Sequence, residues 1–116
     1  MLSLSLGSSD ALLNYVGRQL DNFFPDGHGD AERPALQAHL LPALQRLERC
    51  IAEVRMWSAG SFDHLHSSQY TIFLYYLANT LWRTGGERAL CNKLFGLNKA
   101  LNGIDLFYEI ELPEVF

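Results

Sequence analysis

Apolar side chains recur every three or four positions along most of the chain, which is the spacing of helices that bury one face. This spacing predicts four helices, separated by short stretches rich in Gly, Pro, Ser and Asp. The first helix begins at the capping residues Ser8–Asp10, and the second begins near Asp30 and carries its apolar stripe to Val54. The third runs from about Ser67 to Arg83. The fourth begins at Glu87 and ends at Asn102-Gly103. We therefore expect an all-α, bundle-like fold.

The second predicted helix contains two prolines. Pro34 falls near its start, where we place it in the first turn, because the missing N–H costs little there. Pro42 falls inside the apolar stripe, where a proline loses a hydrogen bond and clashes with the preceding turn. We therefore expect the second helix to be kinked or to restart at Pro42.

The third predicted helix is apolar on every side for more than one turn, and such a helix must be covered from several directions. A small four-helix domain cannot easily provide that cover. We therefore expect part of this helix to meet either another copy of the chain, in a homodimer or a higher oligomer, or a further domain outside this sequence. The residues expected at this interface are Tyr70, Phe73, Leu74, Tyr76 and Leu77. The alternative is a central helix surrounded by its own three neighbours.

The residues after Gly103 follow a different pattern. Apolar and mostly acidic positions alternate from Ile104 to Leu112, which is typical of a half-buried strand. We expect this segment to dock through its apolar side. The predicted organisation is a helical oligomerisation domain over residues 1–103 and a short extended segment over residues 104–116.

Composition and charge exclude several classes of protein. Hydrophobic residues make up 48% of the 116 residues, which argues against disorder, and the net charge of -4 disfavours a nucleic-acid partner. The N-terminus lacks the basic start and long apolar core of a signal peptide, and no stretch reaches the ~18 apolar residues of a membrane span. Cys50 and Cys91 both fall inside predicted helices, which favours buried reduced thiols. We expect a cytoplasmic protein without a membrane partner.

The densest cluster of functional side chains precedes the third helix, where Asp63, His64 and His66 stand close together. Two histidines at this spacing face the same side only in a strand, and no third ligand beyond Asp63 is evident, so we predict no metal site. We interpret Asp63, Ser67 and Ser68 as caps of the helix and the histidines as surface or interface residues. Neighbours at a helix start rarely reach the geometry of a Ser-His-Asp triad.

Residues 26–30 combine glycines with acidic side chains, but they lack the ligand spacing and closing Glu of a calcium-binding EF-hand loop. We interpret this stretch as a flexible turn.

Two stretches resemble serine acetyltransferases and their relatives. The first has their order of a histidine, a glutamine, Leu-Trp, a glycine and Arg-Ala-Leu, and the second, Asn102–Asp105, resembles the entry into their left-handed β-helix of hexapeptide repeats. In this sequence the first stretch comprises His66, Gln69, Leu81-Trp82, Gly86 and Arg88–Leu90. The resemblance covers roughly the second half of the chain.

The resemblance implies that this chain is the non-catalytic, oligomerising N-terminal domain of an O-acetyltransferase that transfers an acetyl group from acetyl-CoA to a hydroxyl. In that family the general-base histidine and the acetyl-CoA cleft belong to the β-helix, whose repeats are absent here. We therefore predict no catalytic residue and no cofactor in this chain, and no activity of the chain alone. Asp63 and His66 are implied to lie at the rim of the acceptor pocket.

The sequence also departs from the family pattern. The third helix has about one turn more between Gln69 and Leu81-Trp82, and Leu106–Tyr108 replaces the usual His-Pro after the entry motif. These differences resemble the branch associated with polysaccharide or other acyl acceptors. The competing hypothesis is a self-contained helical domain whose aromatic helix binds a partner protein or an apolar ligand.

Overall fold

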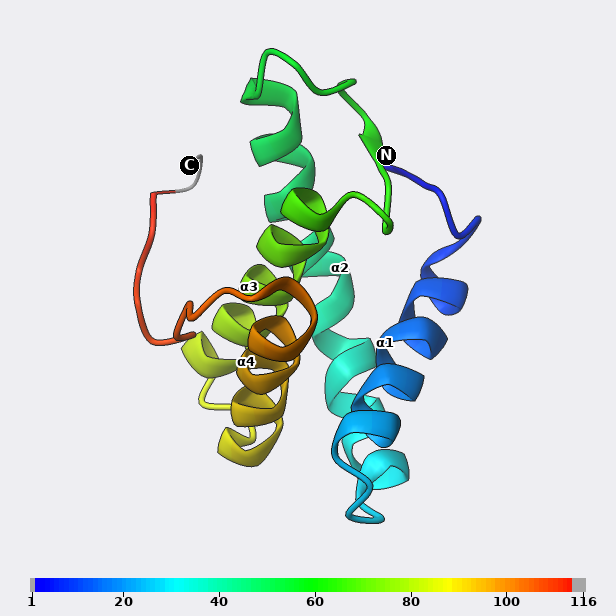
Figure 1. The fold of residues 1–116 in the computed structure, drawn as a ribbon, viewed down its shortest axis with the longest axis vertical. Coiled ribbons are helices and arrows are strands. Elements are labelled where there is room, and N and C mark those ends of the chain that lie inside the picture. The colour runs from blue at the N-terminus through cyan, green and yellow to red at the C-terminus, as the bar shows by residue number, and fades with distance from the viewer. Residues whose placement is uncertain (1, 114–116) are drawn as a thin grey trace.

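The computed structural model describes residues 2–113, which form four α-helices and a two-stranded parallel sheet (Figure 1). The helices are α1 (Ser9–Phe23), α2 (Gly29–Glu53), α3 (Ser67–Arg83) and α4 (Arg88–Asn102). Strand β1 (Ser3–Leu4) pairs in parallel with β2 (Ser61–Phe62), with Ser3 opposite Ser61 and Leu4 opposite Phe62. The all-α, bundle-like prediction is confirmed.

Helix α3 lies at the centre of the fold. It packs against α2 on one side and α4 on the other, while α1 lies along α2 (Figure 1). The β1–β2 pair joins the N-terminus to the loop before α3, although these segments are about sixty residues apart in the sequence. The sheet was not predicted, because each strand has only two residues.

The helix boundaries follow from local capping. Ser8 accepts a hydrogen bond from the Ala11 amide at the start of α1, and Gly103 ends α4 in the left-handed conformation with φ of 66°. Helix α3 has the predicted bounds. These agreements arise because cap residues satisfy backbone groups within a few positions of their own place in the chain.

The structure corrects the predicted place of Pro34 in α2 and excludes one of the two alternatives given for Pro42. The helix begins at Gly29, so Pro34 lies in its second turn and not in its first. The carbonyl of Asp30 therefore lacks its helical donor. Pro42 lies inside one continuous helix, so the helix does not restart there.

The expected oligomer interface on α3 is corrected by the structure. The five side chains assigned to it are buried within the single chain, between α2, α4, the β2 loop and the C-terminal segment; they are Tyr70, Phe73, Leu74, Tyr76 and Leu77. The sequence argument failed because it counted only the helices as cover, whereas both irregular segments also pack on α3. The alternative of an internally covered helix is what the structure shows. The oligomeric state itself stays a prediction.

The C-terminal segment is extended and docked, but it is not a strand. Tyr108 is buried, whereas Ile104 and Ile110, on the same side of the predicted alternation, are 39% and 48% exposed. A turn near residues 107–110 breaks the alternation. The prediction of a strand with period-two alternation from Ile104 to Leu112 is therefore wrong. The predicted extended segment continues to residue 116, and its residues 114–116 lie outside the described part of the chain.

Cys50 and Cys91 are both buried and free, as predicted. The Cys91 thiol contacts the Ala78 carbonyl of α3 at 3.6 Å, and burial raises the pKa of this thiol to about 11. Between residues 2 and 113, no helix is both long enough and apolar enough to cross a membrane.

A buried ion pair connects α2, α4 and the turn before α2. The Lys93 ammonium lies 2.8 Å from the Glu32 carboxylate and 2.7 Å from that of Asp26, and Lys93 and Glu32 are only 9% and 6% exposed. Burial alone would lower the pKa of Lys93, but the bonds to the two carboxylates outweigh it and raise the pKa. The turn predicted at residues 26–30 is present only in part, because Gly29 and Asp30 already belong to α2. Lys93 connects Asp26, in the turn, to Glu32 in the helix.

Candidate functional site

A pocket of about 450 Å³ opens where β1, the loop before β2 and the start of α3 meet. Both predicted rim residues, Asp63 and His66, line this pocket, together with serine hydroxyls and the ring of Trp57. The pocket is shallow and mixed in character, with apolar surface from Leu4 and Phe62 beside the polar groups. It is the place where the sequence-predicted site residues come together.

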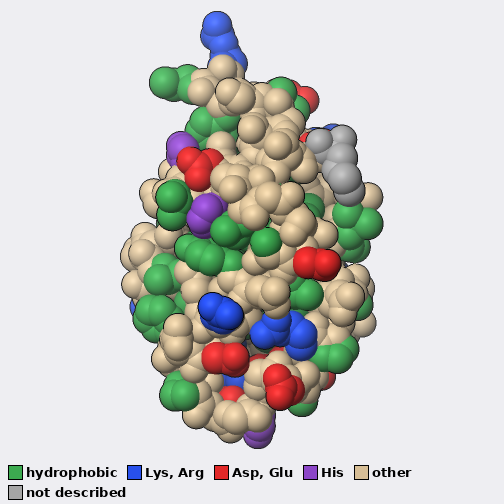
Figure 2. Space-filling model, turned by 90° about the vertical axis from the view of Figure 1, so that its right-hand side faces the viewer, with side chains coloured by type: hydrophobic (Ala, Val, Ile, Leu, Met, Phe, Trp, Pro, Cys, Tyr) green, Lys and Arg blue, Asp and Glu red, His purple; other side chains and the backbone are tan. Residues whose placement is uncertain are grey.

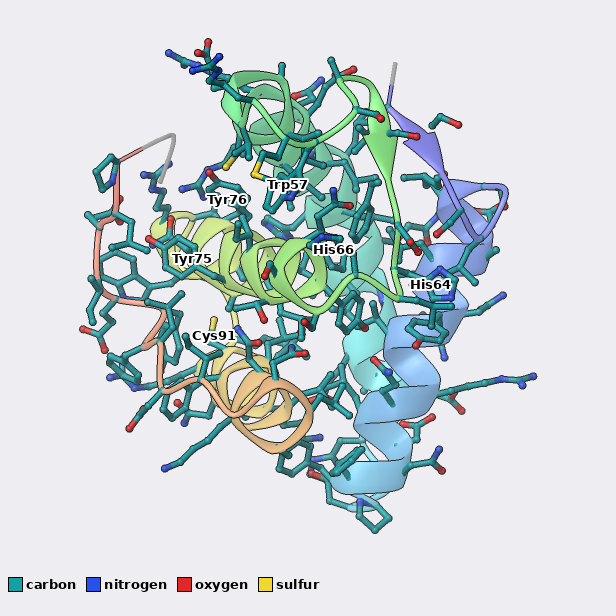
Figure 3. All side chains as sticks on the ribbon, turned by 45° about the horizontal axis from the view of Figure 1, so that its top comes forward. Trp57, His64, His66, Tyr75, Tyr76 and Cys91 are labelled. Atoms are coloured by element: carbon teal, nitrogen blue, oxygen red, sulfur yellow. The ribbon has the colours of Figure 1, made fainter. Side chains whose placement is uncertain are left out.

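His66 begins α3. Its Nδ1 accepts a hydrogen bond from the Gln69 amide at 3.4 Å, which makes His66 the N-cap in place of the predicted Asp63, Ser67 and Ser68. Because Nδ1 accepts, the neutral ring carries its proton on Nε2 and can donate it. The edge of the ring contacts Trp57, with ring centroids 5.4 Å apart (Figure 3).

Asp63 closes the turn before the helix. One oxygen of its carboxylate accepts from the Leu65 amide at 3.0 Å, and its own amide donates to Gln69 Oε1 at 2.8 Å. The Asp63 side chain is thus oriented by the turn and remains exposed to the pocket. A carboxylate held in this way can accept a hydrogen bond from a ligand hydroxyl.

Gln69 is the buried polar residue of the pocket. Only 5% of Gln69 is exposed. Because the Asp63 amide donates to one of the two terminal atoms of the Gln69 side chain, that atom is the oxygen and the other is the NH₂ nitrogen. Among residues 2–113, no acceptor bonds to this NH₂. A ligand oxygen in the pocket is therefore a suitable partner for the Gln69 amide.

His64 does not join this group. Its ring lies toward α1, away from the His66–Trp57 pair (Figure 3), where it contacts Tyr15 edge to face at 4.9 Å. Ser5 Oγ accepts from the His64 amide at 2.9 Å and forms a second hydrogen bond with Nδ1 of the same residue at 2.6 Å. His64 therefore ties the N-terminal strand to the loop.

The geometry of these residues gives neither a triad nor a metal centre. No carboxylate among the described residues bonds to the ring of His64, so the Ser5–His64 pair lacks the third member of a triad. Within the same part of the chain, no three His, Cys, Asp or Glu side chains are grouped to hold a metal ion.

A second set of polar contacts holds the C-terminal segment on α3. The buried Asn79 amide donates to the Tyr108 carbonyl at 2.7 Å and to Glu111 at 3.1 Å. Tyr75 donates its hydroxyl to the Ile110 carbonyl and accepts from the Leu112 amide. Bonds from Arg83, and then from Asn79, lower the pKa of Glu111. These contacts fix the direction in which the chain leaves the helices.

Sequence reasoning missed Trp57. A large aromatic residue in the break between two helices has no helical face to fill, and this was the available signal for a pocket wall. The role of Gln69 inside the pocket was likewise not predicted, although the resemblance included this residue.

Charges of both signs are mixed on the face drawn in Figure 2, where basic and acidic side chains lie beside each other. This face therefore offers no field of one sign to steer a strongly charged partner.

The chain matches no protein-family model, and no curated protein or solved structure is significantly similar to it.

Proposed function

We propose that this chain is the helical domain of a serine acetyltransferase-like O-acyltransferase, and that its pocket forms one wall of the site for the hydroxyl acceptor. The observation that carries the proposal is the convergence of Asp63, His66 and Gln69 on one pocket. Two of these residues, His66 and Gln69, belong to the motif that resembles the family. The complete enzyme would use acetyl-CoA as the acyl donor.

The chemistry of the pocket suits a hydroxylated acceptor. Asp63 supplies an acceptor, Gln69 and His66 supply donors, and Trp57 supplies an aromatic wall. In the family that this chain resembles, the general base and the acetyl-CoA cleft belong to the β-helix, so the role proposed for this chain is positioning of the acceptor. Homo-oligomerisation remains part of the proposal, on a surface other than the buried residues of α3.

The test uses the natural reading frame and its full product. We expect the frame to continue past Phe116 into hexapeptide repeats, and we expect Asp63→Asn and His66→Ala in that product to raise KM for the hydroxyl acceptor while KM for acetyl-CoA stays unchanged. The 116-residue chain incubated with acetyl-CoA and hydroxyl acceptors should release no CoA. A frame without repeats, or turnover by the chain alone, would contradict the proposal.

The alternative is a self-contained domain that binds an apolar ligand. The aromatic rings of α3 cannot provide that site, because they are buried. A groove of about 620 Å³ between β1, α1 and α2 could provide it, since Leu13, Leu40 and the half-exposed Leu41 line it. Binding of a fluorescent fatty acid that is lost in Leu41→Glu would favour this alternative.

A further inference from the structure

The pocket lined by Asp63 and His66 has no basic side chain. Among the described residues that line it, Asp63 is the only Asp, Glu, Lys or Arg. His66 is neutral while it caps α3, because its Nδ1 accepts from the Gln69 amide and so carries no proton. The pocket therefore offers no positive partner to a carboxylate or a phosphate group, and a single exposed carboxylate attracts a cation only weakly.

The start of α3 does not supply the missing positive charge. The Gln69 and Tyr70 amides already donate to the ring and to the carbonyl of His66. Ser67 and Ser68, whose amides are the first two of the helix, are not among the residues that line the pocket. A ligand in this pocket is therefore recognised by hydrogen bonds and packing and not by charge.

Gln69 gives the pocket a buried donor without a partner. Its side-chain oxygen accepts from the Asp63 amide at 2.8 Å, whereas no acceptor among residues 2–113 bonds to its NH₂ group. Only 5% of Gln69 is exposed, so this side chain has little contact with water. A ligand oxygen that accepts from the NH₂ group gains a hydrogen bond at small cost, because the amide is already oriented and largely desolvated.

Asp63 and Trp57 add the two other features that a sugar ring requires. The Asp63 carboxylate is oriented by the Leu65 amide at 3.0 Å and stays exposed, so its remaining lone pairs can accept from two adjacent hydroxyls. Trp57 is half-buried, and its ring packs edge to face with that of His66 (Figure 3). An indole fixed in this way offers apolar surface to C–H groups. A pyranose has hydroxyls at its rim and C–H groups on its faces, which matches this arrangement.

We infer that this pocket binds an uncharged pyranose sugar. The inference rests on the proposed function, since the sugar would be the hydroxyl acceptor of the complete enzyme. It narrows that acceptor, because a free amino acid, a sugar acid or a sugar phosphate would place an unpaired negative group beside Asp63. The volume of about 450 Å³ lies within the range of about 300–1,000 Å³ that is typical of pockets for small molecules.

The experiment is a titration of the ¹⁵N-labelled 116-residue chain with the methyl pyranosides of glucose, galactose and mannose. We expect at least one of them to cause saturable shifts at the side-chain NH₂ of Gln69 and at the indole N–H of Trp57. The matched uronides, which carry a carboxylate in place of the C6 hydroxymethyl group, and L-serine should bind at least about tenfold more weakly. Absence of saturation with all three glycosides, or equal binding of the uronides, would overturn the inference.

Two exposed aspartates give a matched pair of variants. Asp63→Asn keeps an oxygen for the Leu65 amide but removes the charged acceptor, and we expect it to weaken glycoside binding by about tenfold. Asp105→Asn, outside the pocket, should leave binding unchanged. Both positions are exposed, so neither variant should unfold the chain. Equal affinities in the two variants would contradict the assigned role of the pocket.

The result for the sugar can be separated from the result for the acyltransferase. Glycoside binding by this chain, combined with a natural reading frame that lacks hexapeptide repeats, would support the sugar site and contradict the acyltransferase. Hexapeptide repeats combined with a preference for L-serine over every glycoside would overturn the sugar site alone.

Discussion

Asn79 donates its side-chain amide to the backbone carbonyl of Tyr108 over 2.7 Å, and both residues are almost completely buried. A buried amide on the central helix thus fastens the C-terminal segment to the helical domain. The same Asn79 side chain accepts from Arg46 on α2, so one residue connects three parts of the fold.

Replacement of Asn79 should therefore loosen the C-terminal segment. Asn79→Ala leaves the Tyr108 carbonyl and the Arg46 donor without this partner, and we expect a loss of about 1–3 kcal/mol in the free energy of unfolding. Amide exchange at Ile110 and Leu112 should accelerate more than exchange within α1. Asn14→Ala, at an exposed contact with Arg33, serves as the control and should change stability by less than about 0.5 kcal/mol.

Glu111 makes part of this attachment depend on pH. Bonds from Arg83 and Asn79 hold the pKa of Glu111 below its ordinary value of 4.5 in the folded chain. The stability that it contributes is present above pH 4.5 and is lost as the pH falls through the lower folded pKa. Glu111→Gln should flatten the acid limb of a stability-against-pH curve. An identical acid limb in wild type and variant would show that Glu111 has no such role.

Local signals predicted the helices well because they act over a few residues. Ser67–Arg83 has the predicted bounds since the glycines after Thr84 end it, and Gly103 ends α4 through its own backbone conformation. In contrast, the part of the cover of α3 that α2 and α4 do not provide comes from irregular segments, among them the segment containing Tyr108. No periodic pattern places an irregular segment against a particular helix.

The candidate site could be predicted only in part, for the same reason. Asp63 and His66 were identified from a short stretch of sequence, but strand β1 also lines their pocket. Only two residues of β1 pair with β2, and this pairing holds β1 in place.

The buried Lys93 should matter far more than an exposed lysine on the same helix. Lys93→Met leaves the Glu32 carboxylate buried without its partner, and we expect a loss of about 3–5 kcal/mol in stability. Lys99→Met is the matched control, because Lys99 is exposed and lies 3.9 Å from Asp105. Its effect should stay below about 1 kcal/mol in chemical denaturation. Partial recovery is expected in the double variant Glu32→Leu/Lys93→Met.

Cys91 should be chemically inert in the folded chain. Burial raises its pKa to about 11, so the thiolate that reacts with disulfide reagents is scarce at neutral pH. We expect aromatic disulfide reagents to label Cys91 only at the rate at which the native protein opens, and quickly in denaturant. A Ser58→Cys variant, exposed in the pocket loop, provides the control for fast labelling. Rapid labelling of Cys91 at pH 7 would show that the packing of α4 on α3 does not cover this thiol.

A substitution of Leu74 can test whether α3 belongs to the core of the single chain or to the subunit interface that was expected from the sequence. Its side chain has no exposed surface in the single chain, so Leu74→Ala should cost about 2–5 kcal/mol in the free energy of unfolding through lost burial and a cavity. The molar mass from light scattering should not change, because the removed atoms face α3's own neighbours and not another copy. Leu65→Ala, at a leucine that is 76% exposed, should leave both quantities within error of the wild type. Dissociation of an oligomer by Leu74→Ala, with the stability of the monomer preserved, would return this residue to an interface.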